Sequence, residues 1–427
     1  MTQAPGEILF LAHRIPFPPD RGDKIRSHHI LKALAGLAPV HVGTFADDEQ
    51  DHDPEADLAL TAASYHIAHR TKPLAIAALQ ALATRRPISL PAFVDAQLHS
   101  YVRRTLAERT ISTIYAFSSQ MAQYIPADFA GRVVMDFVDV DSAKFEAYAA
   151  NAAQPLRMLY AREGRLLAAY EAKVARRADV SLLVTEEEAA LFRSRLDPAS
   201  RATCDVRALG NGIDCNKFSA VFVNPAAELA STRGPHLLFT GQMDYPPNVA
   251  AVVRFATRIM PTIRAQIPEA QFHIVGRKPS PAVSALDGQA GTRVWGRVDD
   301  MRTWLVGADL VVAPLEIARG VQNKVLEAMS MGRPVLLSPG AATGVAASDG
   351  VELAIADSDD DFVARALWLF GAPHERAAMG QAARQFVTAH QSWPAMLADL
   401  PEIVGIGGRA VRPEVRPEVR PEVRDAA

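Results

Sequence analysis

Residues 310–338, LVVAPLEIARGVQNKVLEAMSMGRPVLLS, contain a strand, a helix and a second strand in succession. The apolar runs at 310–313 and 334–338 have the length and composition of buried strands. A helix is predicted from Asn323 to Met331, and Gly332 is placed to end it. This order predicts parallel strands joined by a crossover helix.

The same alternation covers most of the chain. One series of predicted strands lies at 8–12, 39–45, 113–117, 133–137 and 180–185, and a second at 236–240, 271–275, 293–295, 310–313, 334–338 and 351–355. Between them lie a long helical stretch, 156–178, and a turn at 210–212 whose Gly and Asn residues tolerate a sharp reversal. The predicted fold class is therefore α/β, with two Rossmann-like open sheets facing across a cleft and ligands outside the carboxyl ends of the strands.

Composition excludes several classes of protein. The 427 residues are 49% apolar, which is typical of a packed globular chain. The net charge of -3 gives no basic excess that would indicate a nucleic-acid partner. Only Cys204 and Cys215 are present, which excludes a disulfide framework or a Cys-rich metal site and fits a cytoplasmic location. No run reaches the roughly 18 apolar residues of a spanning helix.

One segment is locally basic. Residues 58–135 contain eight basic and three acidic side chains, and 69–87 reads HRTKPLAIAALQALATRRP, an apolar stretch between basic ends. This pattern suits a helix that rests on anionic lipid, which would place the protein peripherally on the inner face of the plasma membrane. A buried core helix with solvated ends is the alternative interpretation.

The start of the helix at 323–331 is suited to bind an anion. Gly320, Val321 and Asn323 lie where backbone N–H groups and the positive end of the helix dipole coincide. A diphosphate is a natural ligand for such a helix start.

Three charged side chains extend this prediction. Arg319 precedes the helix and Lys324 lies in its first turn, so both can add positive charge beside a diphosphate. Glu327 lies one turn further on, where a carboxylate can accept two hydrogen bonds from a ribose diol. The three residues together predict a nucleotide-sugar pocket; the alternative is that they form surface ion pairs on an ordinary helix.

Together with four further motifs, the stretch 314–338 resembles the group 1 (family 4) glycosyltransferases of the GT-B fold. More narrowly, it is similar to sugar transferases associated with PEP-CTERM exosortase exopolysaccharide loci. The motifs that carry the resemblance are AHRIPFPPDRGDKIRSHHILKAL at 12–34, MDFVDVDSAKF at 135–145, LGNGIDCNKF at 209–218, TGQMDYPPNVAAV at 240–252, and the stretch 314–338.

The resemblance implies an enzyme that moves a sugar from a nucleoside diphosphate to a glycan or lipid-linked acceptor in exopolysaccharide biosynthesis, with retention of configuration and no cofactor. It implies an N-terminal acceptor domain at 1–208, a donor domain at 209–389, and a helical segment at 390–407 that crosses back to the first domain. Residues 408–427 contain the repeat RPEV, whose regularly spaced Pro blocks helical hydrogen bonding, and are predicted to be disordered.

Two departures from the family pattern concern the donor. The family has two glutamates separated by seven residues; the second matches Glu327, but Arg319 occupies the first position. Many relatives also place Arg and Lys in the loop where this chain has Gln242 and Met243, so Gln242 is a candidate donor contact and the positive charge must come from elsewhere. Asn248, near a predicted helix start, is interpreted as a cap or turn residue; the alternative is a contact with the donor.

The resemblance also assigns residues of the N-terminal lobe. The loop PFPPDRGDKIRSHHI, 16–30, is placed beside the donor phosphates and the acceptor, with a helix beginning about Asp23. Gly22 would let the backbone approach the ligand closely. Arg26 is the candidate phosphate contact there, together with Arg21 and Lys24; the alternative is that these are surface charges.

The stretch VMDFVDVDSAKF contains Asp139 and Asp141 in an Asp-x-Asp arrangement that resembles the metal-binding motif of the other major glycosyltransferase fold. Because a cationic helix start can already hold the diphosphate, no metal is expected to be required. The resemblance places this strand end near the reacting sugar, so Asp139 is the candidate that orients or deprotonates the acceptor hydroxyl.

Two other functions are compatible with these residues. A nucleotide-sugar epimerase on the same fold would bind the diphosphate in the same way, and a non-catalytic assembly subunit would account for Arg319 in place of Glu. A dinucleotide oxidoreductase is disfavoured because no GxGxxG follows the first predicted strand.

Overall fold

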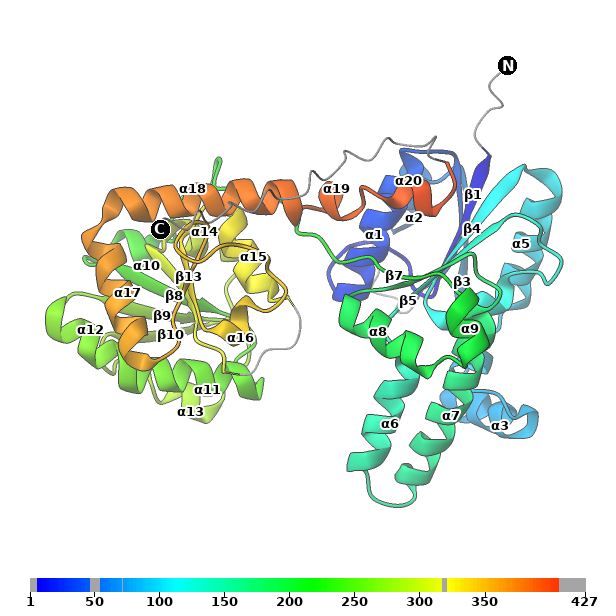
Figure 1. Ribbon diagram of the computed structural model, residues 1–427, viewed down its shortest axis with the longest axis horizontal. Coiled ribbons are helices and arrows are strands. Elements are labelled where there is room, and N and C mark those ends of the chain that lie inside the picture. Colours follow the sequence, from blue (N-terminus) through cyan, green and yellow to red (C-terminus); the bar gives the residue numbers. More distant parts are fainter. Residues whose placement is uncertain (1–5, 47–53, 71, 317–320, 407–427) are drawn as a thin grey trace, which may run out of the picture. The chain divides into compact units, whose positions relative to one another are not determined.

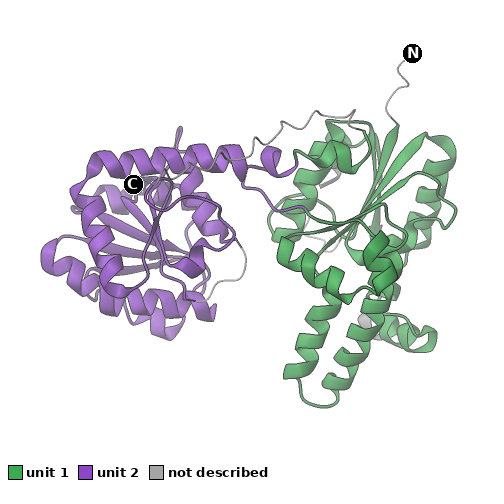
Figure 2. Cartoon of the chain, viewed as in Figure 1, with its two compact units in different colours: residues 1–208, 398–427 green, residues 209–397 purple. Residues whose placement is uncertain are grey.

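The structure is a computed structural model that describes residues 6–46, 54–70, 72–316 and 321–406. The chain divides into two compact units, which Figure 2 distinguishes by colour. Unit 1 comprises Met1–Ala208 and Ala398–Ala427, and unit 2 comprises Leu209–Leu397. The turn at 210–212 thus lies at the start of unit 2. The tail at 408–427 lies outside the described residues.

Unit 1 contains a parallel seven-stranded sheet in the order β3-β2-β1-β4-β5-β6-β7. The strands are β1 (Glu7–Ala12), β2 (Val40–Ala46), β3 (Ser64–His69), β4 (Ile111–Phe117), β5 (Arg132–Val138), β6 (Val180–Leu183) and β7 (Val206–Ala208). The five strands predicted for this region are present. The sequence did not predict β3 and β7, which are the two edge strands: most of β3 is only half-buried and β7 is very short, so neither contains a buried apolar run.

The unit 1 sheet carries helices on both faces (Figure 1). They are α1 (Gly22–Ala35), α2 (Pro54–Thr61), α3 (Leu74–Thr84), α4 (Ser89–Ala92), α5 (Ala96–Glu108), the 3-10 helix η1 (Ser119–Tyr124), α6 (Asp141–Asn151), α7 (Leu156–Ala175), α8 (Glu186–Arg195), α9 (Pro198–Thr203) and α20 (Leu400–Ile403). Helices α6 and α7 form an antiparallel hairpin that projects away from the sheet (Figure 1). Among the described residues, every helix is too short or too polar to span a bilayer.

The segment predicted to cross back, 390–407, is divided between the units. Helix α19 (Trp393–Met396) belongs to unit 2, while α20 belongs to unit 1. There Thr113 Oγ1 donates to the Val404 carbonyl at 2.9 Å, and Arg132 Nε donates to the Ile403 carbonyl at 2.6 Å. These two bonds fix α20 against the beginnings of β4 and β5.

Unit 2 contains a parallel six-stranded sheet in the order β10-β9-β8-β11-β12-β13. Its strands are β8 (His236–Thr240), β9 (Gln271–Val275), β10 (Thr292–Gly296), β11 (Leu310–Ala313), β12 (Val335–Leu337) and β13 (Ala354–Ile355). All six were predicted. The chain order reverses between β8 and β11, which in an open α/β sheet is the point where ligands bind.

The helices of unit 2 surround this sheet. They are α10 (Ala227–Ala230), α11 (Pro246–Arg254), the π-helix η2 (Phe255–Ile259), α12 (Met260–Gln266), α13 (Pro281–Ser284), α14 (Met301–Gly307), α15 (Asn323–Ser330), α16 (Pro339–Ala342), α17 (Asp359–Gly371), α18 (Pro373–His390) and α19.

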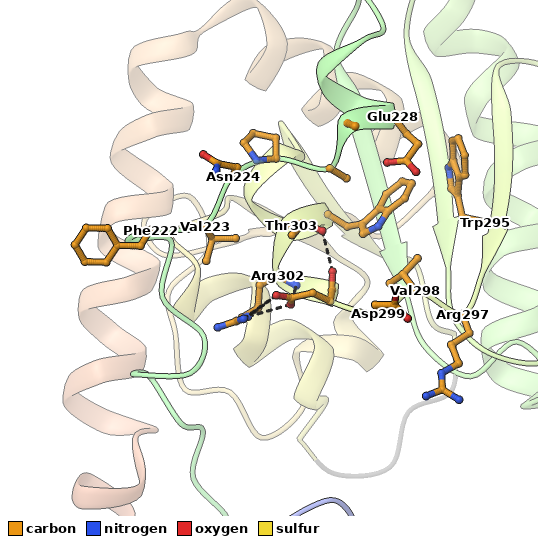
Figure 3. A pocket seen from close by; sticks show the side chains of 15 residues that line it. Phe222, Val223, Asn224, Glu228, Trp295, Arg297, Val298, Asp299, Arg302 and Thr303 are labelled. Carbon is orange, nitrogen blue, oxygen red and sulfur yellow. Dashed lines mark hydrogen bonds and ion pairs between the residues drawn. The ribbon is translucent and has the colours of Figure 1, made fainter.

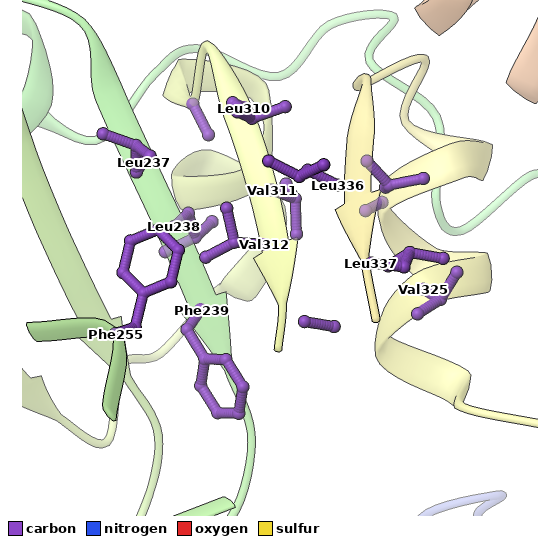
Figure 4. Packing of buried hydrophobic residues seen from close by; sticks show 14 of the residues in the cluster. Leu237, Leu238, Phe239, Phe255, Leu310, Val311, Val312, Val325, Leu336 and Leu337 are labelled. Atoms are coloured by element: carbon purple, nitrogen blue, oxygen red, sulfur yellow. The ribbon is translucent and has the colours of Figure 1, made fainter. Parts of the chain in front are cut away.

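Helix α15 begins at the predicted residue, and Gly332, with φ of +67°, follows its end as expected. Its buried face, which includes Val325 and Leu326, packs in the same core as Val311 of β11 and Leu336 of β12 (Figure 4). Because one face of α15 is part of the core, the position of its first turn relative to the sheet is fixed.

Candidate functional site

A pocket of about 830 Å³ lies in unit 2 at the carboxyl ends of β8, β9 and β10, beside the start of α15. Glycine ends each of these strands: Gly241 follows β8, Gly276 follows β9, and Gly296 is the last residue of β10. A Cβ at Gly276 would lie 1.6 Å from the Gly241 carbonyl oxygen, so the backbones meet more closely than a side chain allows. A Cβ at Gly241 would lie 3.1 Å from Lys324 Nζ. At Gly241 and Gly276 the pocket is therefore lined by backbone, and the Lys324 side chain lies against it.

Lys324 reaches into this pocket from the first turn of α15. Its Nζ donates to Asn248 Oδ1 at 2.7 Å and lies 4.3 Å from the centre of the Phe239 ring. Burial lowers the pKa of Lys324 to about 8, and the charge of Glu327 acts in the opposite direction. The ammonium group has a neutral acceptor and an aromatic face as described neighbours, so much of its charge is available to an anion.

Glu327 lines the same pocket one helical turn after Lys324. Burial raises the pKa of Glu327 to about 7, although the positive charges of Lys217 and Lys324 oppose this. A buried carboxylate in a pocket, with cations nearby, is suited to accept hydrogen bonds from a hydroxyl pair.

The start of α15 forms the rest of this wall. Val321 and Asn323 line the pocket, and the N-cap residue Gln322 makes no side-chain hydrogen bond to the first turn within the described residues. The predicted residues Arg319 and Gly320 lie outside the described residues. The structure thus brings Val321, Asn323, Lys324 and Glu327 together with Gln242, as predicted for a single ligand site.

Two cations of the pocket were not predicted. Arg277 and Arg297 follow β9 and β10, and both line the pocket. Arg277 Nη2 donates to Gln242 Oε1 at 3.2 Å. The signal was in the sequence: Gly276-Arg277 and Gly296-Arg297 repeat a Gly-Arg pair directly after two predicted strands. They supply the positive charge that the 240–252 loop lacks.

Arg297 and Val298 also border a second pocket, of about 680 Å³, between residues 222–228, β10 and α14 (Figure 3). In this view Arg297 lies at the edge of the lining residues and points away from Glu228 and Trp295. Arg297 therefore borders both of these pockets.

Asn248 is a turn residue and not the cap of a helix. The N-cap of α11 is Tyr245, and the Asn248 side chain is buried, with 6% exposed. Its Nδ2 donates to the Gln242 carbonyl at 2.9 Å while its Oδ1 accepts from Lys324. Asn248 thus holds the Gln242 turn, in agreement with the turn interpretation, and also orients Lys324; the cap interpretation is corrected.

The charged residues at the start of α1 also differ from the prediction. Arg26 is 1% exposed, and its Nη2 and Nε lie 3.0 Å and 3.1 Å from Asp136 Oδ2 in β5. Tyr115 donates to the same oxygen at 2.8 Å. Lys24 is fully buried and donates to the Phe17 carbonyl at 3.3 Å. The predicted phosphate contact by Arg26 is therefore corrected: its guanidinium balances a buried carboxylate, which would otherwise be costly.

Gly22 and Asp139 also belong to unit 1 and are not part of the unit 2 pocket. A Cβ at Gly22 would meet nothing within 4 Å, so packing does not require glycine there. Asp139 follows β5, and its Oδ2 lies 2.7 Å from Lys144 Nζ, which also contacts Asp141 at 3.3 Å. No group of three His, Cys, Asp or Glu side chains among the described residues could hold a metal ion.

Comparisons with known proteins agree with this architecture. Residues 234–371 match the family model described as glycosyl transferases group 1. No curated protein matches the chain. Among solved structures, HepE from Anabaena in complex with UDP is 15% identical, with a TM-score of 0.58 over 93% of this chain and 99% of that chain.

Two further structures cover a similar share of the chain. Sucrose-phosphate synthase from Thermosynechococcus elongatus is 16% identical, with a TM-score of 0.58 over 93% of this chain and 98% of that one. WaaG, a glycosyltransferase involved in lipopolysaccharide biosynthesis, is 16% identical, with a TM-score of 0.54 over 93% of this chain and all of that one. The chain thus has the GT-B fold, and its residues 234–371 form a domain of the group 1 glycosyltransferase type.

Proposed function

We propose that this protein transfers a sugar from a nucleoside diphosphate sugar to a glycan or lipid-linked acceptor. The observation that carries the proposal is the unit 2 pocket, where Lys324 and Glu327 lie together at the start of a helix with Arg277 and Arg297 on the adjacent strand ends. The family match over 234–371 supports the same activity. HepE, a structural neighbour, is described in complex with UDP-glucose.

Each part of the donor has a matching group in this pocket. The diphosphate is placed at the first turn of α15, where backbone N–H groups, Lys324 and the two arginines provide positive charge. The ribose hydroxyls are placed at Glu327, and Gln242 contacts the donor from the opposite loop. In this scheme no metal ion is required, because the cations of the chain balance the diphosphate.

The same groups would promote the reaction. Negative charge builds on the diphosphate as the bond to the sugar breaks, so fixed cations there stabilise the transition state more than the ground state. We assign Asp139 of unit 1 to orient or deprotonate the acceptor hydroxyl. Retention of configuration, and a place in exopolysaccharide synthesis, are proposed from the resemblance of the motifs to that group of transferases.

Segment 69–87 is proposed to touch the inner-membrane surface. Helix α3 lies within this segment, and its Leu79 and Leu82 are 67% and 54% exposed. A core helix would bury these side chains, so their exposure supports the surface interpretation of the segment over the core one.

A donor screen tests the proposed activity. UDP, GDP, ADP and TDP sugars are added to the protein in thermal-shift assays, and we expect at least one to raise the melting temperature. Lys324→Ala should reduce that shift, while Arg258→Ala, which removes an exposed cation of unit 2 outside the pocket, should retain it. If no sugar nucleotide stabilises the wild type, the proposal fails.

Product analysis with the active donor separates the alternatives. A transferase leaves the donor sugar unchanged when no acceptor is added, whereas an epimerase converts it to an isomer. A non-catalytic subunit would give the same polysaccharide output in cells after Glu327→Gln.

A further inference from the structure

The tip of the α6–α7 hairpin in unit 1 exposes several apolar side chains to solvent. Tyr148 is 53% exposed, Leu156 50%, Met158 69% and Leu159 37%. The hairpin projects beyond the neighbouring helices (Figure 1), so no described element of unit 1 covers its tip. Large apolar side chains gathered at one projecting end are unusual for a protein surface and indicate an interaction site.

The charge around this tip has one sign. Residues 147–162 contain Arg157 and Arg162 and no acidic residue. The two flanking carboxylates have partners: Glu146 pairs with Arg195, and the buried Glu163 accepts from the Ile88 backbone N–H at 2.6 Å and lies 3.6 Å from Arg162 Nη1. Arg157 is therefore the tip arginine whose charge faces solvent. Exposed apolar groups beside arginines, with no free carboxylate, complement an anionic and partly apolar surface.

Helix α3 lies beside this hairpin and also combines exposed apolar side chains with nearby basic residues. Arg162 Nη2 donates to the Ala81 carbonyl of α3 at 2.8 Å and to the Arg86 carbonyl just after it at 3.3 Å. The exposed apolar residues of α3 are Ile76, Leu79 and Leu82. Residues 58–94, which include α3, also contain no Asp or Glu, although Arg70, Lys72, Arg85 and Arg86 are among them. Helix α3 thus lies beside the α6–α7 hairpin at one end of unit 1 (Figure 1).

We propose that the α6–α7 tip, together with the exposed face of α3, docks on an anionic lipid bilayer. The apolar side chains of both elements enter the boundary between headgroups and acyl chains, while the arginines remain at the level of the lipid phosphates. A bilayer fits this surface better than a protein partner does, because two separate helical elements present exposed apolar groups beside basic residues, and residues 58–94 and 147–162 contain no Asp or Glu. Two attachment elements make the binding stronger than segment 69–87 alone would.

Docking through the hairpin also indicates the class of acceptor, an inference that rests on the proposed transfer activity. Helix α6 starts at Asp141, two residues after the candidate Asp139, and its 11 residues extend about 16 Å toward the tip at 1.5 Å per residue. A bilayer at the tip is then one short helix away from the strand end where the acceptor hydroxyl is assigned. An acceptor whose lipid part stays in the membrane and whose sugar extends from it fits this arrangement.

Vesicle cosedimentation of the full chain tests the docking surface. We expect the wild type to bind vesicles that contain phosphatidylglycerol and not vesicles of phosphatidylcholine alone. Met158→Glu and Leu79→Glu should each weaken binding about tenfold or more, because each places a carboxylate at the lipid boundary. Leu60→Glu is the matched control: Leu60 is 87% exposed on α2, outside this surface, and its replacement should leave binding unchanged.

Three results would overturn the proposal. The wild type could fail to bind anionic vesicles, or Met158→Glu could bind as well as the wild type. Alternatively, size-exclusion chromatography with light scattering could show a dimer that Met158→Glu converts to a monomer, which would assign the tip to a second copy of the chain. A retained thermal shift with the donor nucleotide in each variant shows that the protein is folded and separates failure of docking from failure of the proposed transfer function.

Discussion

Helices α1 and α15 lie in different units and each carries a cation in its first turns, yet the two cations have different roles. Arg26 of α1 is paired with Asp136 inside unit 1, whereas Lys324 of α15 is held by the neutral Asn248 and the Phe239 ring. Both side chains are largely removed from water. The difference lies in the hydrogen-bond partner: a buried carboxylate accepts from Arg26, whereas a neutral amide accepts from Lys324, on which Glu327 acts only through its charge. A cation near a helix start is therefore a candidate binding residue when no buried carboxylate accepts a hydrogen bond from it.

The largest expected effect comes from breaking the unit 1 pair. Arg26→Ala leaves Asp136 buried without its cation, so we expect the free energy of unfolding to fall by about 3–5 kcal/mol. Chemical denaturation followed by circular dichroism measures this loss. At a temperature where the variant is folded, its affinity for the donor nucleotide should match that of the wild type. A variant with normal stability and no donor binding would instead show that Arg26 contacts the phosphates.

The matching change in unit 2 should have the opposite outcome. Lys324→Met keeps most of the side-chain volume and removes the buried charge, so stability should be unchanged or higher. We expect the affinity for the nucleoside diphosphate to fall by about 2 kcal/mol, or roughly 30-fold, through loss of a charge-assisted contact. Isothermal titration calorimetry measures the affinity, and an unchanged dissociation constant would show that Lys324 does not contact the nucleoside diphosphate.

Donor affinity should depend on pH in a bell shape. Burial raises the pKa of Glu327 to about 7 and lowers that of Lys324 to about 8. Binding uses the deprotonated carboxylate and the protonated ammonium group, so affinity falls below pH 7 as Glu327 gains a proton and above pH 8 as Lys324 loses one.

Variants assign the two limbs of that profile. Glu327→Gln should lower affinity about tenfold at its best pH, by roughly 1.4 kcal/mol, and remove the acid limb. Lys324→Met should remove the alkaline limb. Titrations of donor binding across about two pH units on each side measure both effects. An acid limb that persists in Glu327→Gln would show that another group titrates there.

The smallest effect concerns the residue that orients Lys324. Asn248→Ala removes the acceptor of the Lys324 ammonium group and the donor to the Gln242 carbonyl, so affinity should fall by about 1 kcal/mol, or roughly fivefold. Asn248→Asp gives the sharper contrast, since it places a carboxylate beside Lys324 and reproduces the counter-charge seen at Arg26. The aspartate variant should bind the diphosphate more weakly than the alanine variant; stronger binding would contradict the comparison.

The sequence predicted the interior strands of both sheets because each is a short buried apolar run. It missed β3 and β7, because most of β3 is only half-buried and β7 has three residues, so neither contains a buried apolar run; β10 and β13, the edge strands of the unit 2 sheet, were predicted. The start of α15 and Gly332 were also predicted, because helix boundaries depend on local residues. The role of Arg26 could not be predicted from its own neighbours in the sequence, because its partner Asp136 lies on another element. The one relevant signal was the acidic residue within the apolar strand RVVMDFV, which indicated that a buried cation was needed. Arg277 and Arg297 join the pocket only because β9 and β10 are neighbours in the sheet.

The glycines that end β8 and β9 limit how this protein can change its choice of substrate. Any substitution at Gly276 would push the two strand ends apart, because its Cβ would overlap the Gly241 carbonyl. The part of the pocket formed by these two strand ends thus cannot be reshaped by substitution at Gly276 without disturbing the sheet. Altered selectivity, whether evolved or engineered, would have to arise at rim side chains such as Gln242, Arg277 and Arg297.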